Sequence, residues 1–184
     1  MSASVIGENG LKPLLLAKRL QRNVNKPLMV HIGSAPPQVS DILRHLDQGD
    51  IVTHCFNGKS NNLFDQKGKP LSALLDARSR GVLLDIGHGT ASFSFAAAEC
   101  AKKAGVAFDT VSTDLYEGNK RNGPVYDMAT TLTKFLALGA TLETCIQSVT
   151  EKAAAAIGRK DSVLYGLGRR QSLPFLNLRR KSKS

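Results

Sequence analysis

The sequence predicts an α/β fold built from parallel βα units. Short apolar runs alternate along the chain with segments whose apolar residues recur at helical spacing. The short runs are continuously apolar, which is typical of parallel strands that are covered on both faces. Four such units at similar spacing fit either a small open sheet or half of a (β/α)₈ barrel.

The first two units follow a helix that is expected over 11–22. Pro27 separates this helix from a strand over 28–32, because the residue before a proline is disfavoured in a helix. The segment 39–46 carries apolar residues at i, i+3, i+4 and i+7 and is therefore expected to be the next helix. A second strand is expected over 51–56.

The third unit has a helix ahead of its strand and another behind it. A short helix is expected over 71–81, followed by a strand over 82–86. The apolar stripe over 93–104 predicts a long helix, with Ser92 as its N-cap and Gly105 as its C-cap.

The last unit closes the predicted order of elements. A strand is expected over 108–113, and helices are expected over 125–136 and 142–157. Each of these helices is followed by a glycine, Gly139 or Gly158, which is a common helix end.

The composition suits one domain with a sizeable core. The chain has 184 residues, of which 42% are hydrophobic. No apolar stretch reaches the roughly 18 residues that a membrane span needs, and the first ten residues do not resemble a secretory signal. The cysteines, Cys55, Cys100 and Cys145, form no CxxC pair, which favours a reducing compartment. We therefore expect a cytoplasmic protein without a membrane segment.

The net charge of +10 would suit a nucleic-acid-binding protein, but its distribution argues against this function. Six basic residues and no acidic residue lie in the last 16 positions, 169–184. The only aromatic residue among them is Phe175. We expect residues 1–168 to form the folded domain and 169–184 a disordered basic tail. Nucleic-acid binding through this tail is the weakest functional alternative.

Polar side chains stand at the carboxyl ends of all the predicted strands. They are His31, His54, His88 and Asp114, and in parallel α/β folds these ends meet at the functional edge of the sheet. Imidazoles and carboxylates are the usual ligands of Zn²⁺ and similar ions. The pattern predicts a shared metal site, formed by His31, His54 and Asp114. His45 lies within a predicted helix and is expected to be solvated.

Several neighbouring residues have simpler structural interpretations. A strand histidine can be a hydrogen-bonded packing residue. His88 is flanked by glycines that permit close backbone approach, so it is a candidate for substrate binding rather than metal binding. Cys55 follows His54 in the strand and is expected to point to the opposite face, into the core. Asp85 is expected to be structural, and Asn57 lies in a predicted loop.

Five ordered stretches resemble the amidohydrolase superfamily, in particular its dihydroorotase-like deacetylase branch. They are PLMVHIGSAPP, GDIVTHCFNGK, RGVLLDIGHGTASFSF, DTVSTDLYEGN and GPVYDMATTLTKFLALG. Members of this family are metal-dependent hydrolases with a (β/α)₈ barrel. They act on amides, cyclic amides or acylated hydroxy acids.

The resemblance implies a role for each site residue. His31 and His54, at the ends of the family's fifth and sixth strands, would bind one divalent metal ion, expected to be Zn²⁺. Asp114, at the end of the eighth strand, would bind the other ion of complete relatives and act as the catalytic general base. His88, after the seventh strand, and Asn57 would contact the substrate.

Two features of the family are absent from this sequence. It has no HxH pair of the kind found on the family's first strand and no counterpart of the carboxylated lysine on the fourth. Residues 1–168 are therefore expected to form the C-terminal half of a TIM barrel, truncated at both ends. One metal site is expected here, where complete relatives have two.

The resemblance implies a metal-dependent amidohydrolase or deacetylase that cleaves an amide, cyclic amide or acyl ester of a small molecule. A catalytically inactive remnant of the family is the alternative. Half a barrel leaves strand edges without partners. We therefore expect a second copy, or a separate partner, to cover these edges.

Overall fold

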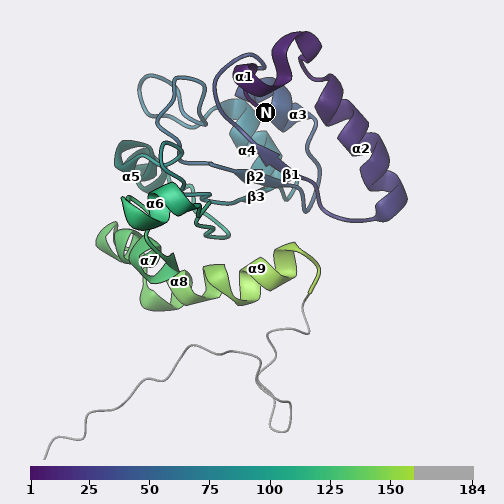
Figure 1. Cartoon of the computed structure of the whole chain (residues 1–184). Helices are drawn as coiled ribbons and strands as arrows, with labels where there is room; N and C mark the ends of the chain where they lie inside the picture. Colours follow the sequence, from purple (N-terminus) through teal and green to yellow (C-terminus); the bar gives the residue numbers. More distant parts are fainter. Residues whose placement is uncertain (160–184) are drawn as a thin grey trace, which may run out of the picture.

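The computed structural model describes residues 1–159 and has a parallel sheet at its centre (Figure 1). The strands are β1 (Met29–His31), β2 (Ile51–Thr53) and β3 (Leu83–Leu84), in the order β1-β2-β3. Each strand pairs in parallel with the next one along the chain. The predicted α/β fold of parallel βα units is therefore confirmed.

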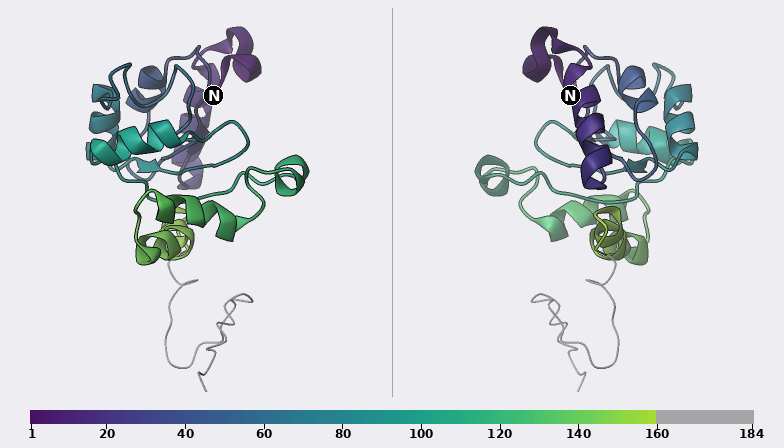
Figure 2. Two further views of the ribbon diagram at one scale, coloured as in Figure 1. Left: turned by 90° about the vertical axis from the view of Figure 1, so that its left-hand side faces the viewer. Right: turned by 90° about the vertical axis from the view of Figure 1, so that its right-hand side faces the viewer.

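Helices precede, connect and follow the strands, and Figure 2 shows that the short helix α6 stands away from the rest of the molecule. In chain order the helices are α1 (Ala3–Ile6), the 3₁₀ helix η1 (Gly7–Asn9), α2 (Lys12–Val24), α3 (Val39–Arg44), α4 (Ser72–Ser79), α5 (Phe95–Lys103), α6 (Glu117–Arg121), α7 (Met128–Ala137), α8 (Leu142–Val149) and α9 (Glu151–Ala156).

One face of the sheet builds the hydrophobic core. Val30, Val52 and Leu84 lie side by side in register, and the most exposed of them, Val30, is only 5% exposed. They belong to one core cluster with Ile42 of α3 and Leu74 of α4. Burial of these apolar side chains between sheet and helices is the main stabilisation of the fold.

The opposite face becomes polar toward the strand ends. His31 lies beside Thr53 in register, and Asp85, which directly follows β3, forms a parallel bridge with Thr110. Because side chains alternate along a strand, these residues point away from the face that carries Val30.

The predicted fourth strand, 108–113, is reduced to this single bridge. The backbone amides of Asp109 and Thr110 both donate to the carbonyl of Leu84, which interrupts the regular parallel ladder. The segment still follows β3, because Ile86 donates to the Thr110 carbonyl and His88 to that of Ser112. The expectation of a full strand was wrong, but its position in the sheet was right.

Helix boundaries also differ from those predicted. The N-cap of α5 is Ser94 rather than Ser92, and its hydroxyl accepts from the Ala97 amide. The helix expected from 125 begins at Met128, after Asp127 caps it by accepting from the Thr130 amide. The helix expected over 142–157 is divided into α8 and α9, because Thr150 has non-helical backbone angles.

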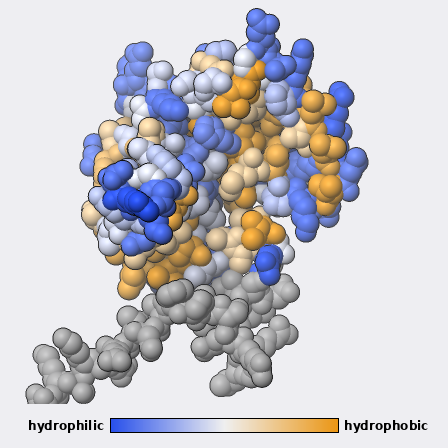
Figure 3. Space-filling model, in the orientation of Figure 1, coloured by the Kyte–Doolittle hydropathy of each residue, from blue (hydrophilic) through white to orange (hydrophobic). Residues whose placement is uncertain are grey.

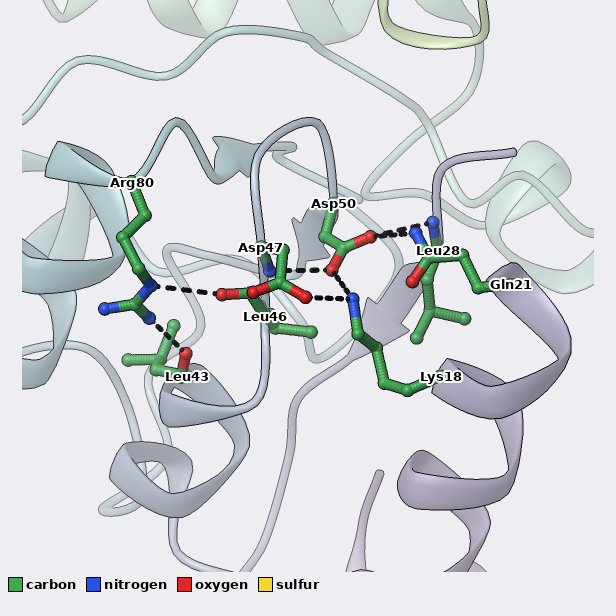
Figure 4. Close-up of polar contacts among 8 residues, drawn as sticks. All are labelled: Lys18, Gln21, Leu28, Leu43, Leu46, Asp47, Asp50 and Arg80. Carbon is green, nitrogen blue, oxygen red and sulfur yellow. Dashed lines mark hydrogen bonds and ion pairs between the residues drawn. The ribbon is translucent and has the colours of Figure 1, made fainter. Parts of the chain in front are cut away.

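A buried carboxylate ties α2 to the starts of two strands (Figure 4). Asp50, just before β2, accepts hydrogen bonds from Lys18 at 2.6 Å and Gln21 at 2.5 Å, both on α2. The backbone amides of Leu28 and Asp47 also donate to it. This network lies at the amino-terminal ends of the strands, which in barrels is the face concerned with stability rather than catalysis.

Asp50 should make the stability of the protein sensitive to acid. Burial alone would raise the pKa of this carboxyl, but the hydrogen bonds from Asp47, Lys18, Gln21 and Leu28 outweigh burial and lower it. A lowered pKa in the folded state contributes stability that is complete above the unfolded value, about 3.9, and is lost as the pH falls below it. Urea unfolding at a series of pH values should therefore show a steeper loss below about pH 4 for the wild type than for Asp50→Asn. Equal slopes would contradict this assignment.

Helix α2 presents an apolar stripe on the surface. Leu16, Leu20 and Val24 follow one another at i, i+4 spacing and are 57%, 64% and 60% exposed. Figure 3 shows hydrophobic side chains gathered over this helix. Met29 on β1 is also half exposed. A surface of this kind is typical of an interface rather than of a solvated helix.

Two expectations concern membranes and the tail. None of the helices within residues 1–159 is long and apolar enough to cross a membrane. The expected basic tail, 169–184, and the predicted domain end at 168 lie outside the described residues.

Candidate active site

The predicted site residues stand at the carboxyl ends of the strands, as the sequence indicates. His31 ends β1, and His54 follows β2 directly. Their rings meet edge to face, with centroids 4.3 Å apart. Side chains from two neighbouring strands thus converge at one point, which we call the mouth.

His31 is held in its neutral form at the mouth. Its pKa is lowered to about 4, chiefly by burial and further by His54 and by the positive charges of the Met1 amino terminus and Lys59, while Asp114 acts in the opposite direction. A neutral imidazole keeps a nitrogen lone pair that can bind a metal ion.

His54 is fixed by its backbone and by one hydrogen bond. It has a φ of 63°, which is unusual for a residue with a side chain, and it is only 5% exposed. Its Nδ1 lies 2.6 Å from the carbonyl of Gly87. Because a carbonyl only accepts, Nδ1 carries the hydrogen and Nε2 is the nitrogen left to bind a ligand.

Asp114 reaches the mouth from the segment beside β3. It is exposed and, like His54, has a positive φ, 49°. Its Oδ2 would lie 2.6 Å from a Cβ at Gly89, so the carboxylate rests against that glycine. Strained backbone at both residues is the kind of outlier that gathers at functional sites.

The rings of His31 and His54 meet, but within the described residues the three predicted ligands are not brought together around one point. Among residues 1–159, no group of three or more His, Cys, Asp or Glu side chains is arranged to hold a metal ion. The set of His31, His54 and Asp114 therefore stays a prediction, as does the role of Asp114 as catalytic base.

His88 is surrounded by protein groups. It is 3% exposed, its ring stacks on Phe93, and its Nδ1 lies 2.8 Å from the carbonyl of Gly89. Its Nε2 accepts from the ammonium of Lys134 on α7 at 2.9 Å. Burial, together with the charge of Lys134, lowers the pKa of His88. Both ring nitrogens have partners, so a substrate contact by His88 stays a prediction.

Asn57 shapes the loop that follows β2. It is 1% exposed; its amide group donates to the carbonyl of His54, and its oxygen accepts from the backbone amide of Lys59. These bonds fix the turn that carries Lys59. The predicted substrate contact of Asn57 is not tested by this arrangement and stays a prediction.

Asp85 supports the mouth from beneath. It is 1% exposed and accepts from three hydroxyls, those of Thr53 at 2.7 Å, Thr110 at 2.7 Å and Ser112 at 2.6 Å. It thus joins β2, β3 and the segment beside β3. These bonds give Asp85 the structural role that the sequence predicts. Cys55 is fully buried, as expected for the residue after His54.

Three further residues lie around the predicted site residues: Gly87, Lys59 and Lys134. A Cβ on Gly87 would clash with the Thr53 hydroxyl and the His54 ring. The glycine on each side of His88 was the available signal for this close approach. Nothing in the sequence distinguishes Lys59 or Lys134 from the other lysines.

Comparison with known proteins gives the family context. No protein-family model matches the chain. A deacetylase of Enterococcus faecalis is 42% identical over 186 residues, which covers 100% of this chain and 50% of the relative. A deacetylase of Brucella anthropi is 36% identical over 95% of this chain and 43% of its own length.

Solved structures agree with these relatives. The crystal structure of an adenine deaminase matches with a TM-score of 0.83 and 48% identity, over 85% of this chain and 43% of the other. The chain resembles half of an amidohydrolase-superfamily barrel. A dihydroorotase crystal structure matches with a TM-score of 0.74 and 38% identity, over 87% of this chain.

The amidohydrolase resemblance predicted from the five sequence stretches is thereby confirmed. The chain spans about half the length of the curated relatives it matches. The matched structures are likewise covered over 43% of their chains, so the predicted half of a barrel is confirmed as the architecture.

Proposed function

We propose that this chain forms part of a metal-dependent hydrolase that cleaves an amide, cyclic amide or acyl ester of a small molecule. The observation that supports this most directly is the His31–His54 pair, whose rings meet at the ends of adjacent strands. The relatives named deacetylase and the structural likeness to an adenine deaminase and a dihydroorotase support the same reaction class.

The donor groups at the mouth suit a divalent ion such as Zn²⁺. His31 offers a neutral imidazole, and the hydrogen bond from Nδ1 of His54 to Gly87 leaves its Nε2 for a ligand. When bound, such an ion polarises a carbonyl and lowers the pKa of water to about 7. In this proposal Asp114, a carboxylate at the same mouth, accepts the proton of the attacking water and returns it to the leaving group.

Metal titration of the full chain tests the proposal. His31→Ala and His54→Ala should each weaken Zn²⁺ binding by more than about 100-fold, because each removes a direct ligand. His45→Ala is the matched control, since His45 caps the end of α3 and should leave affinity unchanged. Calorimetric titration measures the binding, and release of acetate from N-acetyl and O-acetyl substrates measures turnover.

The outcomes separate the two candidate functions. Wild-type affinity in the His54→Ala chain would contradict the metal site. Zinc binding without turnover at any added Zn²⁺ would support the inactive-remnant alternative.

We also infer that the apolar surface of Leu16, Leu20, Val24 and Met29 is covered by the remaining βα units of a barrel. These side chains border the open edge at β1, where in the described residues no further strand pairs. Such units could come from a second copy or another stretch of polypeptide. Light scattering on the titration samples reports the assembly, and a strictly monomeric chain that turns over substrate would contradict this inference.

A further inference from the structure

We propose that Asn119 is the positioning residue of Asp114, and that its buried side chain holds the backbone conformation from which the Asp114 carboxylate reaches the mouth. This inference rests on the proposed hydrolase function, in which Asp114 is the general base. It assigns a role to the segment 115–126, which carries α6 and stands away from the rest of the molecule (Figure 2).

Asp114 has a backbone conformation that needs support from its surroundings. Its φ of 49° lies in the left-handed region, which a residue with a side chain adopts only at a cost. The carboxylate rests against Gly89, since its Oδ2 would lie 2.6 Å from a Cβ there. Burial lowers the pKa of His31 and the charge of Asp114 opposes this lowering, so the carboxylate acts on the mouth from this place. A negative φ would point the Cα–Cβ bond of Asp114 in another direction.

The peptide groups on both sides of Asp114 are fixed. The carbonyl of Thr113 accepts from the backbone amide of Gly89 at 3.0 Å. The carbonyl of Asp114 itself accepts from the side-chain amide of Asn119 at 3.0 Å. The first bond belongs to the pairing of this segment with the residues after β3, whereas the second is supplied by one side chain. Because both peptide groups are held, the strained conformation between them can persist.

Asn119 is itself held by the segment that contains it. It is 0% exposed, although Asp114 and most of α6 are exposed. Its Oδ1 accepts from the backbone amide of Tyr116 at 2.9 Å, and its backbone carbonyl accepts from the amide of Tyr126 at 3.1 Å. A carbonyl only accepts and a backbone amide only donates, so the two ends of the side chain cannot exchange places. Rotation of this side chain would leave buried polar atoms without partners.

NMR on the full chain tests whether Asn119 holds Asp114. A positive φ brings the amide and α protons of a residue close together, so Asp114 of the wild type should show a strong NOE between its own two protons. Asn119→Ala removes both side-chain bonds. At pH 7, Asn119→Asp keeps the shape and an acceptor for the Tyr116 amide, but places an oxygen against the Asp114 carbonyl. In both variants the NOE of Asp114 should fall to the intensity of an extended residue.

Turnover of the zinc-loaded chain gives a second readout. Because Asp114 is proposed to transfer a proton in the chemical step, both variants should lower kcat per folded molecule by about 10- to 100-fold. KM should stay within about twofold of the wild-type value, since substrate binding does not depend on the proton transfer. Unfolding curves give the folded fraction by which kcat is corrected, so a loss of stability alone does not produce this result.

Two control variants separate positioning from a general loss of structure. Asn62→Ala removes a similar pair of side-chain bonds, to a backbone carbonyl and a backbone amide of the loop after β2. Tyr116→Phe removes an exposed hydroxyl bond to Thr90 at 2.8 Å and keeps the backbone amide that Asn119 binds. Both variants should keep the strong NOE of Asp114.

The possible results distinguish this inference from the hydrolase proposal. A weak NOE of Asp114 in the wild type, an unchanged NOE in both Asn119 variants, or an equal loss in Asn62→Ala would overturn the role of Asn119 and leave the hydrolase proposal standing. A lost NOE with unchanged kcat would overturn it as well, since the conformation of Asp114 would then not serve the reaction. A wild type that releases no acetate at any added Zn²⁺ would count against the hydrolase function, and with it against this inference.

Discussion

Gly87→Ala is expected to destabilise the protein by about 3 kcal/mol or more and to displace the His54 ring. Gly87 has a φ of 51°, where a side chain is strained. An added Cβ would also clash with the Thr53 hydroxyl and lie 2.6 Å from Nδ1 of His54. The strain and the clash add, because backbone and side chains on both sides of the glycine are buried. Denaturant unfolding gives the loss of stability, and zinc titration reports the displaced imidazole.

Gly105→Ala separates the two causes. Gly105 also has a positive φ, 69°, but a Cβ there would have no heavy atom within 4 Å. This variant should lose only the backbone term, about 1 kcal/mol, and keep its zinc affinity. Equal losses of unfolding free energy in the two variants would show that the close contacts around Gly87 add nothing to the backbone term.

Asp85→Ala is expected to cost about 3 to 5 kcal/mol of unfolding free energy. The substitution removes the shared acceptor of the Thr53, Thr110 and Ser112 hydroxyls and leaves a cavity under the mouth. Each buried hydroxyl left without a partner costs about 1 to 3 kcal/mol, with neighbouring water able to relieve part of the sum. Urea unfolding followed by circular dichroism measures the change.

Two control variants test whether this loss of stability comes from the Asp85 carboxylate. Asp85→Asn keeps the volume and one acceptor oxygen, so its loss should be clearly smaller. Asp76→Ala removes an exposed carboxylate from α4 and should stay within about 0.5 kcal/mol of the wild type. A loss below about 1 kcal/mol in Asp85→Ala would mean that the three hydroxyls find other partners.

Much of the architecture could be predicted because burial leaves a periodic record in the sequence. The apolar runs before His31 and His54 and the stripe of α5 report which faces are covered, and the order of strands and helices follows from them. Cys55 could be placed in the core because strand neighbours point to opposite faces. The length of the fourth strand was overestimated. Its apolar run does not reveal that two backbone amides share the Leu84 carbonyl and so interrupt the ladder.

The site was predictable in its members but not in their partners. Residue type and strand ends indicated His31 and His54, and the structure places their rings together. His88 also follows a predicted strand, and Asn57 is implied only by the family resemblance. The polar atoms of both are already bonded, to Lys134 and to the backbone near His54. Those bonds join residues far apart in the chain or depend on the turn geometry, so periodicity does not contain them.

The sequence by itself determined the parallel βα order, the edge of the sheet where chemistry gathers and the family resemblance. These depend on burial patterns and on short motifs, which are local properties of the chain. Only the tertiary structure decided that Gly87 holds His54 through its carbonyl and that Asp85 accepts from three hydroxyls. These features arise where separate strand ends meet, and their distances are fixed by packing rather than by spacing along the chain.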